Sequence, residues 1–164
     1  MKQPEYWIKH LDLQAHPEGG FYKETYRSRE TIPAEGLPNH FHGDRNFSTA
    51  IYFLLRSEDR SMFHRIKSDE LWHFHAGTSL SIYVLMNDEL VIHTLGAEPD
   101  KGQSLQIVIP ANSWFGAKVD ESNSYVLAGC TVAPGFDFQD FEIAERALLL
   151  NEFPKYQATI EMLT

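Results

Sequence analysis

The feature that most constrains this chain is a series of short apolar stretches in which hydropathy repeats every second residue. Over residues 79–86, aliphatic side chains alternate with serines and a tyrosine, as on a strand that buries one face. Turn-forming residues such as Asn87-Asp88 and Gly96 separate the stretches, as expected between strands. The expected strands span residues 19–26, 48–55, 61–66, 70–75, 79–86, 89–95, 104–110, 113–119 and 124–132. Many short strands at regular spacing predict an all-β sandwich or barrel.

Helices are predicted only near the two ends of the chain. Residues 4–11 have helical spacing and begin with a proline, which predicts a short N-terminal helix. Asp137 is a candidate N-cap for one amphipathic C-terminal helix, which Pro154 would end. Residues 31–45, rich in proline and glycine, are expected to form a long loop. No repeat or linker divides the chain, so we expect one domain over residues 1–164.

The charge balance bears on partners and on location. The chain has 14 Lys and Arg against 23 Asp and Glu, a formal net charge of −9, which disfavours nucleic acid and anionic membranes as partners. Cys130 is the only cysteine, so no internal disulfide can form, and we expect a buried thiol. No apolar run is long enough to span a bilayer, and the first residues do not resemble a signal peptide. We therefore expect a cytoplasmic protein.

Residues that could carry chemistry concentrate in residues 63–77, which hold three histidines and two carboxylates. Imidazole and carboxylate groups serve as general acids and bases and as metal ligands. His64 and Glu70 flank a turn, and a hairpin would bring them together; we predict that they form a catalytic pair inside the barrel. Alternation puts His73 and His75 on the face opposite Glu70. These two histidines are candidate ligand-binding residues or metal ligands, or they satisfy hydrogen bonds near a sheet edge or an interface.

The aromatic run after Gly19-Gly20 supplies further candidates. On a regular strand, Tyr22, Glu24 and Tyr26 share one face, and we predict that they line the pocket. The alternative is an edge strand whose Glu and Lys side chains are solvated. Trp114 is a candidate for closing the pocket, with filling of the core as the alternative.

Two motifs resemble those of the cupin superfamily. Residues 64–77 resemble its first motif, in which Glu70 and Gly77 have the expected spacing, and residues 110–115 resemble its second. Met62 and Phe115 stand where two of the four usual metal ligands would lie. We therefore predict no tightly bound metal and no cofactor, with a divalent metal as an alternative.

A second resemblance covers nearly the whole chain. Residues 16–28, 50–55, 69–72 and 134–138 are similar to a small cupin subfamily classed as a domain of unknown function. The resemblance implies a double-stranded β-helix, or jelly-roll barrel, a homodimer, and a kinship in fold with nucleotide-sugar epimerases. It implies no particular reaction.

These observations lead to three hypotheses about function. The first is an isomerase or epimerase of a sugar or nucleotide sugar, with His64 as acid or base and Glu70 or a tyrosine as its partner. The second is a non-catalytic module that binds a small acidic or aromatic metabolite, and the third is a metal-dependent cupin enzyme. Each takes a small molecule as its ligand. Because residues 48–55 are apolar on both faces, we also expect a homodimer.

Overall fold

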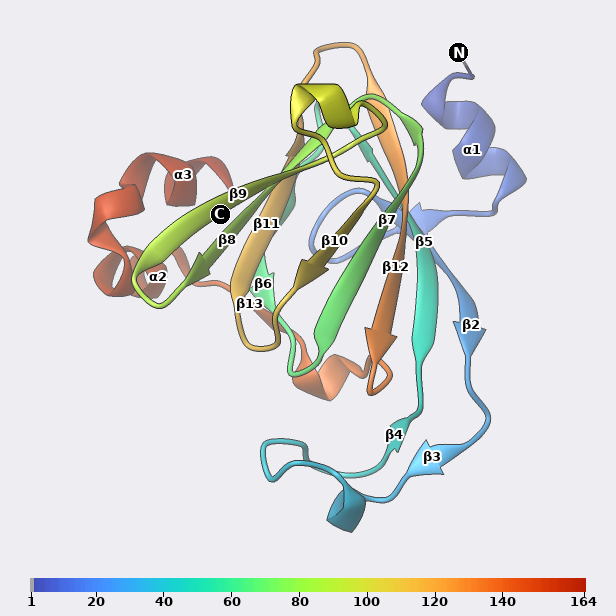
Figure 1. Ribbon diagram of the computed structural model, residues 1–164, viewed down its shortest axis with the longest axis vertical. Coiled ribbons are helices and arrows are strands. Elements are labelled where there is room, and N and C mark those ends of the chain that lie inside the picture. Colours follow the sequence, from blue (N-terminus) through green and yellow to red (C-terminus); the bar gives the residue numbers. More distant parts are fainter. Residues whose placement is uncertain (1) are drawn as a thin grey trace.

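The computed structural model describes residues 2–164, which form two facing β-sheets with helices at both ends of the chain (Figure 1). The prediction of an all-β jelly roll is confirmed. The strands are β1 (Gln14–Ala15), β2 (Phe21–Arg27), β3 (Thr31–Ile32), β4 (Arg45–Asn46), β5 (Thr49–Arg56), β6 (Ser61–Arg65), β7 (Asp69–Gly77), β8 (Leu80–Met86), β9 (Glu89–Leu95), β10 (Gln106–Ile109), β11 (Trp114–Val119), β12 (Tyr125–Ala133) and β13 (Glu142–Ile143).

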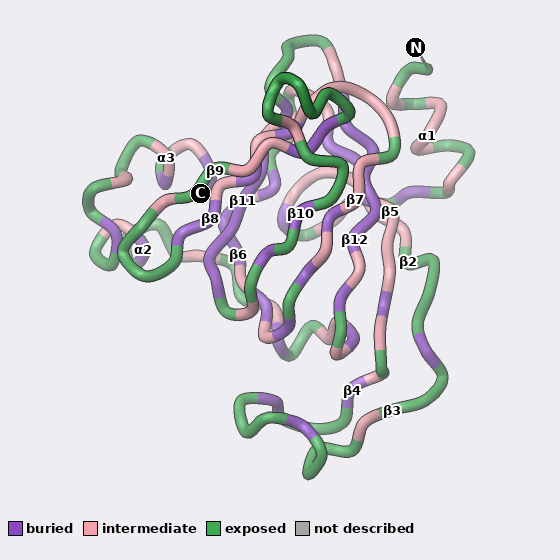
Figure 2. The backbone as a smooth tube through the Cα atoms, viewed as in Figure 1, coloured by how far each residue is buried: buried purple, intermediate pink, exposed green. Residues whose placement is uncertain are grey.

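The strands of both sheets are antiparallel, and the two sheets differ in their number of strands. One has six strands in the order β1-β2-β5-β12-β7-β10, and the other has five in the order β13-β6-β11-β8-β9. Neighbouring strands that are distant in sequence, such as β5 and β12, show the crossovers of a jelly roll. The burial colouring in Figure 2 shows that the buried residues lie mainly along the strands, whereas the connecting loops are mostly exposed.

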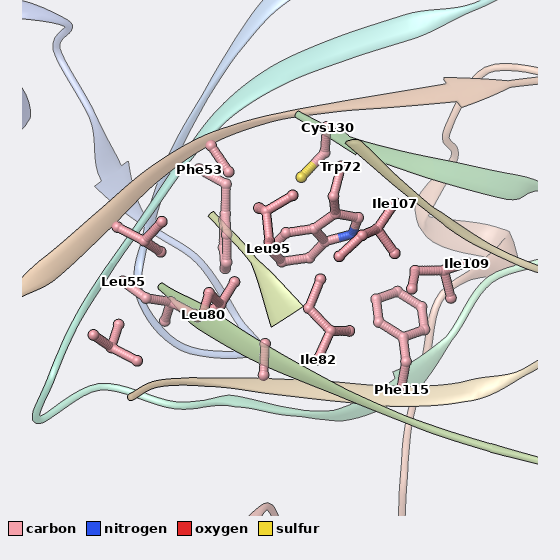
Figure 3. Close-up of a cluster of buried hydrophobic side chains, with 14 of the residues drawn as sticks. Phe53, Leu55, Trp72, Leu80, Ile82, Leu95, Ile107, Ile109, Phe115 and Cys130 are labelled. Carbon is pink, nitrogen blue, oxygen red and sulfur yellow. The ribbon is translucent and has the colours of Figure 1, made fainter. Parts of the chain in front are cut away.

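The space between the sheets is filled by inward-facing side chains from both. Phe53, Trp72 and Phe115 are each 1% exposed and pack with aliphatic residues of β8, β10 and β12. The close-up in Figure 3 shows Cys130 beside Trp72 at one edge of this cluster. The core therefore fills most of the barrel but gives way to polar groups near Cys130, where the candidate site lies.

The N-terminal helix, α1 (Pro4–His10), lies against the outer face of the six-stranded sheet (Figure 1). Trp7 and Ile8 pack near Leu54, and the Trp7 indole N–H donates a hydrogen bond to the Tyr125 hydroxyl at 2.8 Å. The apolar outer face predicted for residues 48–55 is thus partly covered by the chain's own helix.

The C-terminal region differs from the single helix predicted from Asp137 onward. Asp137 caps a short 3-10 turn, η3 (Phe138–Asp140), and β13 then pairs with β6. Two helices follow, α2 (Arg146–Glu152) and α3 (Gln157–Met162), separated by a 3-10 turn that Pro154 begins. A C-terminal helix that ends before Pro154 is therefore present, as predicted, but it starts at Arg146, because Asp140 forms a buried ion pair and the next residues extend the five-stranded sheet.

That buried ion pair joins the long loop to the C-terminal region. Arg45 donates to both carboxylate oxygens of Asp140, at 2.7 and 2.6 Å, and their side chains are 2% and 4% exposed. The predicted loop carries two short strands, β3 and β4, and a 3-10 turn, η1 (Ala34–Gly36). It extends away from the barrel in Figure 1. Another 3-10 turn, η2 (Pro99–Lys101), lies between β9 and β10.

Within the described residues, no helix is long and apolar enough to cross a membrane.

Candidate functional site

A cavity of about 140 Å³ lies between the six-stranded sheet and the segment of residues 136–141. Its inner wall carries ionisable groups, and its outer part is rich in aromatic rings. The residues that line it are Gln14, His16, Glu18, Tyr22, Glu24, Arg27, Thr49, Ile51, Phe53, His64, Ile66, Glu70, Trp72, Cys130, Val132, Phe136, Phe138 and Phe141.

Glu18 is held at this wall by the backbone around it. Gly19 and Gly20 have φ angles of +111° and +73°, and a Cβ on Gly19 would lie 2.0 Å from the carbonyl oxygen of Arg60. Only glycine permits this close approach to β6. The Met62 N–H donates to the Glu18 carbonyl at 2.9 Å, and the Ser61 hydroxyl donates to Glu18 Oε1 at 2.8 Å. These contacts fix the position of the Glu18 side chain, and the residue is only 5% exposed.

Glu18 forms an ion pair with His64. Glu18 Oε2 lies 3.0 Å from His64 Nε2, and His64 Nδ1 donates to the Met62 carbonyl at 2.7 Å. Burial alone would lower the pKa of His64, but the Glu18 carboxylate outweighs it and raises that pKa. Burial would likewise raise the pKa of Glu18, but the His64 charge and the hydrogen bonds lower it. We conclude that His64 is an imidazolium whose two ring nitrogens are both engaged.

His16 lies beside this pair as a neutral ring. The Glu18 N–H donates to His16 Nδ1 at 3.2 Å, and the ring packs edge-on against Tyr22. Burial lowers the pKa of His16, which the nearby Glu18 charge only partly opposes. The neutral imidazole therefore fixes the turn that carries Glu18.

Glu70 supplies the second carboxyl of the cavity, from the start of β7. Glu70 pairs with Val132 on the adjacent strand β12, and its side chain lines the cavity beside Cys130. Burial raises the pKa of Glu70 to about 7; the His64 charge opposes this rise and the Glu18 charge adds to it. Unlike Glu18, Glu70 makes no ion pair with any of residues 2–164. Burial also raises the pKa of the Cys130 thiol, which stays protonated.

A β-bulge decides which residues of β2 reach the cavity. Glu24 opposes Ile51 and Tyr26 opposes Ala50, so Thr25 is an extra residue in the ladder. Tyr22 and Glu24 precede the bulge and line the cavity, as predicted. Tyr26 turns outward and is 54% exposed, contrary to the prediction, and Arg27 lines the cavity instead.

Arg27 closes the mouth of the cavity together with Glu24. Its guanidinium donates to both Glu24 oxygens at 3.0 and 2.8 Å, to Asn46 Oδ1 at 2.8 Å and to the Phe136 carbonyl at 3.0 Å. Four of its five N–H donors are thus satisfied within the chain.

Three other predicted ligand-binding residues lie outside the cavity. His73 Nε2 lies 3.2 Å from Thr131 Oγ1, and His75 stands against Tyr52, both on the outer face of the sheet. Trp114 packs in a separate cluster beside α2 and α3, with the Arg65 guanidinium 4.3 Å from its ring. Strand alternation accounts for all three positions, because the residues next to them, Trp72, Phe74 and Phe115, point toward the core.

His64 and Glu70 share one cavity, as the sequence predicts, whereas Glu18, His16 and Arg27 were not among the predicted site residues. The two glycines after Glu18 were the available signal, since such a pair permits close backbone approach. Nothing local pointed to Arg27, because the bulge depends on the pairing of β2 with β5.

The cupin metal-binding pattern does not fit these residues. The Phe115 ring, 1% exposed, lies 4.1 Å from the His64 ring and fills the place of one ligand. Both nitrogens of His64 are engaged with Glu18 and Met62. Among residues 2–164, no three His, Cys, Asp or Glu side chains come together as a set that could hold a metal ion.

Similar proteins were found in several organisms. An uncharacterised protein of Saccharomyces cerevisiae, YML079W, is 30% identical over 142 residues, which cover 81% of this chain and 71% of that protein. A hypothetical protein from Leishmania major has a solved structure with 36% identity and a TM-score of 0.90, covering 99% of both chains. Protein SO0799 from Shewanella oneidensis is 38% identical, with a TM-score of 0.89 over 100% of this chain and 98% of that one.

More distant structures share the fold alone. Oxalate decarboxylase from Bacillus subtilis is 12% identical with a TM-score of 0.57, and the match covers 94% of this chain and 37% of that chain.

Residues 5–144 match the sequence family described as "Cupin superfamily (DUF985)". This match, together with the relatives that resemble the chain along most of its length, shows that the chain belongs to the DUF985 family of the cupin superfamily.

Proposed function

We propose that this protein is an isomerase or epimerase that moves a proton within a small, sugar-like substrate bound in the cavity. The observation that carries the proposal is the juxtaposition of the fixed Glu18–His64 ion pair with Glu70, a buried carboxyl that makes no ion pair of its own within residues 2–164. A proton carrier works best when its pKa lies near the working pH. Glu70, with a pKa of about 7, meets that condition.

The geometry supports different roles for the two residues of the predicted pair. The sequence favours His64 as the acid or base, but both of its ring nitrogens already have partners. Glu70 is therefore the proton carrier in this proposal. His64 instead holds the Glu18 carboxylate in place at the wall of the cavity and does not exchange a proton with the substrate.

The proposed step moves one proton between Glu70 and a carbon of the substrate, while the electron pair of the broken C–H bond stays within the substrate. The Glu70 carboxylate removes a proton from the carbon next to a carbonyl group, and the electron pair of the broken C–H bond moves to the carbonyl oxygen. For isomerisation, protonated Glu70 gives the proton to the former carbonyl carbon, the proton of the neighbouring hydroxyl passes to the former carbonyl oxygen, and the carbonyl re-forms on the neighbouring carbon. For epimerisation, the planar intermediate first turns in the cavity, so that protonated Glu70 returns the proton to the opposite face of the same carbon and the original carbonyl re-forms.

Solvent exchange tests the proposal even while the substrate is unidentified. Aldoses and ketoses of three to six carbons are incubated with the protein in deuterated water, and deuterium uptake next to the carbonyl is followed by NMR. We expect uptake for at least one sugar, and a loss of ~10²–10⁴-fold in Glu70→Gln. Glu89→Gln, on the exposed start of β9, is the matched control and should keep the wild-type rate. Binding without uptake would favour the non-catalytic module.

A further inference from the structure

The cations that line the cavity are already engaged within the chain. His64 uses both ring nitrogens, and Arg27 uses four of its N–H donors, two of them on Glu24. The His16 ring accepts the Glu18 N–H, which leaves it uncharged. No other lysine or arginine is among the lining residues that the structure describes.

From this pairing we infer that the cavity accepts uncharged polyhydroxyl molecules and discriminates against carboxylates and phosphates. The inference rests on the proposed function, because it names the substrate class of the same site.

The inner wall favours hydrogen-bond donors over anions. Each oxygen of the Glu18 carboxylate accepts one bond from the chain, Oε1 from Ser61 and Oε2 from His64. A carboxylate oxygen can accept two bonds, so Glu18 can still accept from a substrate hydroxyl. An anionic group at this wall would face Glu18, and Glu70 when ionised, and the lining cations are already paired. Such like-charge contacts disfavour binding strongly.

The outer part of the cavity suits the apolar face of a sugar ring. Phe136, Phe138 and Phe141 pack edge to face with centroids 5.1–6.1 Å apart, and Phe138 is 55% exposed. Tyr22 and Phe53 also line the cavity. Aromatic rings with few polar groups between them bind the C–H faces of a ligand while the inner carboxyls orient its hydroxyls.

Matched pairs of ligands test this inference by titration calorimetry or ligand-observed NMR. Each pair joins a neutral sugar to its anionic form: D-glucose with D-glucuronate, and D-fructose with D-fructose 6-phosphate. For at least one pair, we expect the wild-type protein to bind the neutral member about 10-fold more tightly or better. Glu24→Gln removes the carboxylate that neutralises Arg27, which frees a positive charge for an anionic ligand. This variant should therefore show a smaller preference for the neutral member of each pair, or should prefer the anionic member. Glu89→Gln removes the same charge far from the cavity and should leave the preference unchanged.

The outcomes separate this inference from the proposed function. Equal or tighter binding of the anionic members by the wild-type protein would overturn the inference, as would failure of every neutral member to bind. Neutral preference without deuterium uptake would support the substrate class and refute the proton transfer. Deuterium uptake that depends on Glu70, together with a preference for anions, would do the reverse.

Discussion

Glu18 Oε2 lies 3.0 Å from His64 Nε2, in a contact that joins the turn before β2 to the middle of β6. The contact explains why two ionisable groups can stay charged while almost fully buried, since a buried charge needs a partner. It also leaves Glu70 as the group of this cluster whose protonation can change near neutral pH.

Replacement of Glu70 by Gln should change how stability depends on pH. The pKa of Glu70 is raised from 4.5 to about 7 in the folded state, so the folded protein holds this proton where the unfolded chain releases it. Wild-type stability therefore falls as pH rises from about 4.5 to about 7. Glu70→Gln lacks this titration. Between pH 4 and pH 8, its free energy of unfolding should therefore rise by about 3 kcal/mol relative to that of wild type. Urea unfolding across this range measures the difference, and parallel curves would contradict the raised pKa.

Replacement of Glu18 by Gln should discharge His64. The carboxylate sustains the raised pKa of His64, so without it burial lowers that pKa and the ring loses its Nε2 proton. The stability that the pair contributes is present below the unfolded His pKa of about 6.5 and is lost as pH rises through the higher folded value. Nitrogen NMR of the imidazole reports both protons directly. Ser61→Ala keeps the carboxylate and should keep the charge; identical spectra for wild type and Glu18→Gln would rule out the ion pair.

A side chain at Gly19 should disturb both the fold and the site. An alanine Cβ there would lie 2.0 Å from the Arg60 carbonyl oxygen, so the turn that carries Glu18 must move. We expect Gly19→Ala to cost several kcal/mol, on the order of 3, and to shift the His64 NMR signals. Gly102 also has a positive φ, +78°, but an alanine Cβ at that position would have no neighbouring atom within 4 Å. Gly102→Ala should therefore cost only about 1 kcal/mol and leave His64 unchanged.

Removal of one partner from the Arg45–Asp140 pair should destabilise the protein strongly. Both side chains are buried, and breaking such a pair typically costs about 3–5 kcal/mol. Arg45→Met leaves Asp140 with Lys67, at 3.5 Å. In thermal unfolding, the double variant Arg45→Met/Asp140→Leu should recover much of the loss. A double variant no more stable than Arg45→Met would show that the cost lies in the loop itself.

We expect a homodimer in solution. Helix α1 covers Leu54, but Val108 on β10 is 51% exposed and Leu105 before it is 56% exposed, on the same sheet. A second copy that covers this face would bury them symmetrically. Sedimentation at micromolar concentration should give twice the chain mass of 18.9 kDa; a single-chain mass would contradict the expectation.

The barrel could be predicted from the sequence because its signals are local. Alternation within β8 and the Asn87-Asp88 turn after it depend on no distant residue. The same holds for Glu70 and His73, whose opposite faces follow from the strand period. The start of the C-terminal helix is predicted too early because helical spacing is a local signal, whereas the pairing of Asp140 with Arg45 is not.

The missing part of the candidate site depends on contacts between distant segments. Glu18 becomes part of a site only through its contacts with Ser61 and His64, and no spacing rule in the sequence connects these three residues. The exchange of Tyr26 for Arg27 depends on one extra residue in the pairing of β2 with β5. A sequence pattern predicts which face a residue takes only while the ladder stays regular.

The Trp72 indole has a consequence for how ligands can be found. Its Nε1 is buried close to the Glu70 carboxyl and belongs to a side chain that lines the cavity. The other tryptophans, Trp7 and Trp114, lie outside it. A protein carrying Trp7→Phe and Trp114→Phe would keep a single fluorophore at the wall of the barrel. Its fluorescence emission would shift when a polar molecule approached the indole. A library of metabolites could therefore be screened for binding by tryptophan fluorescence before any reaction is known.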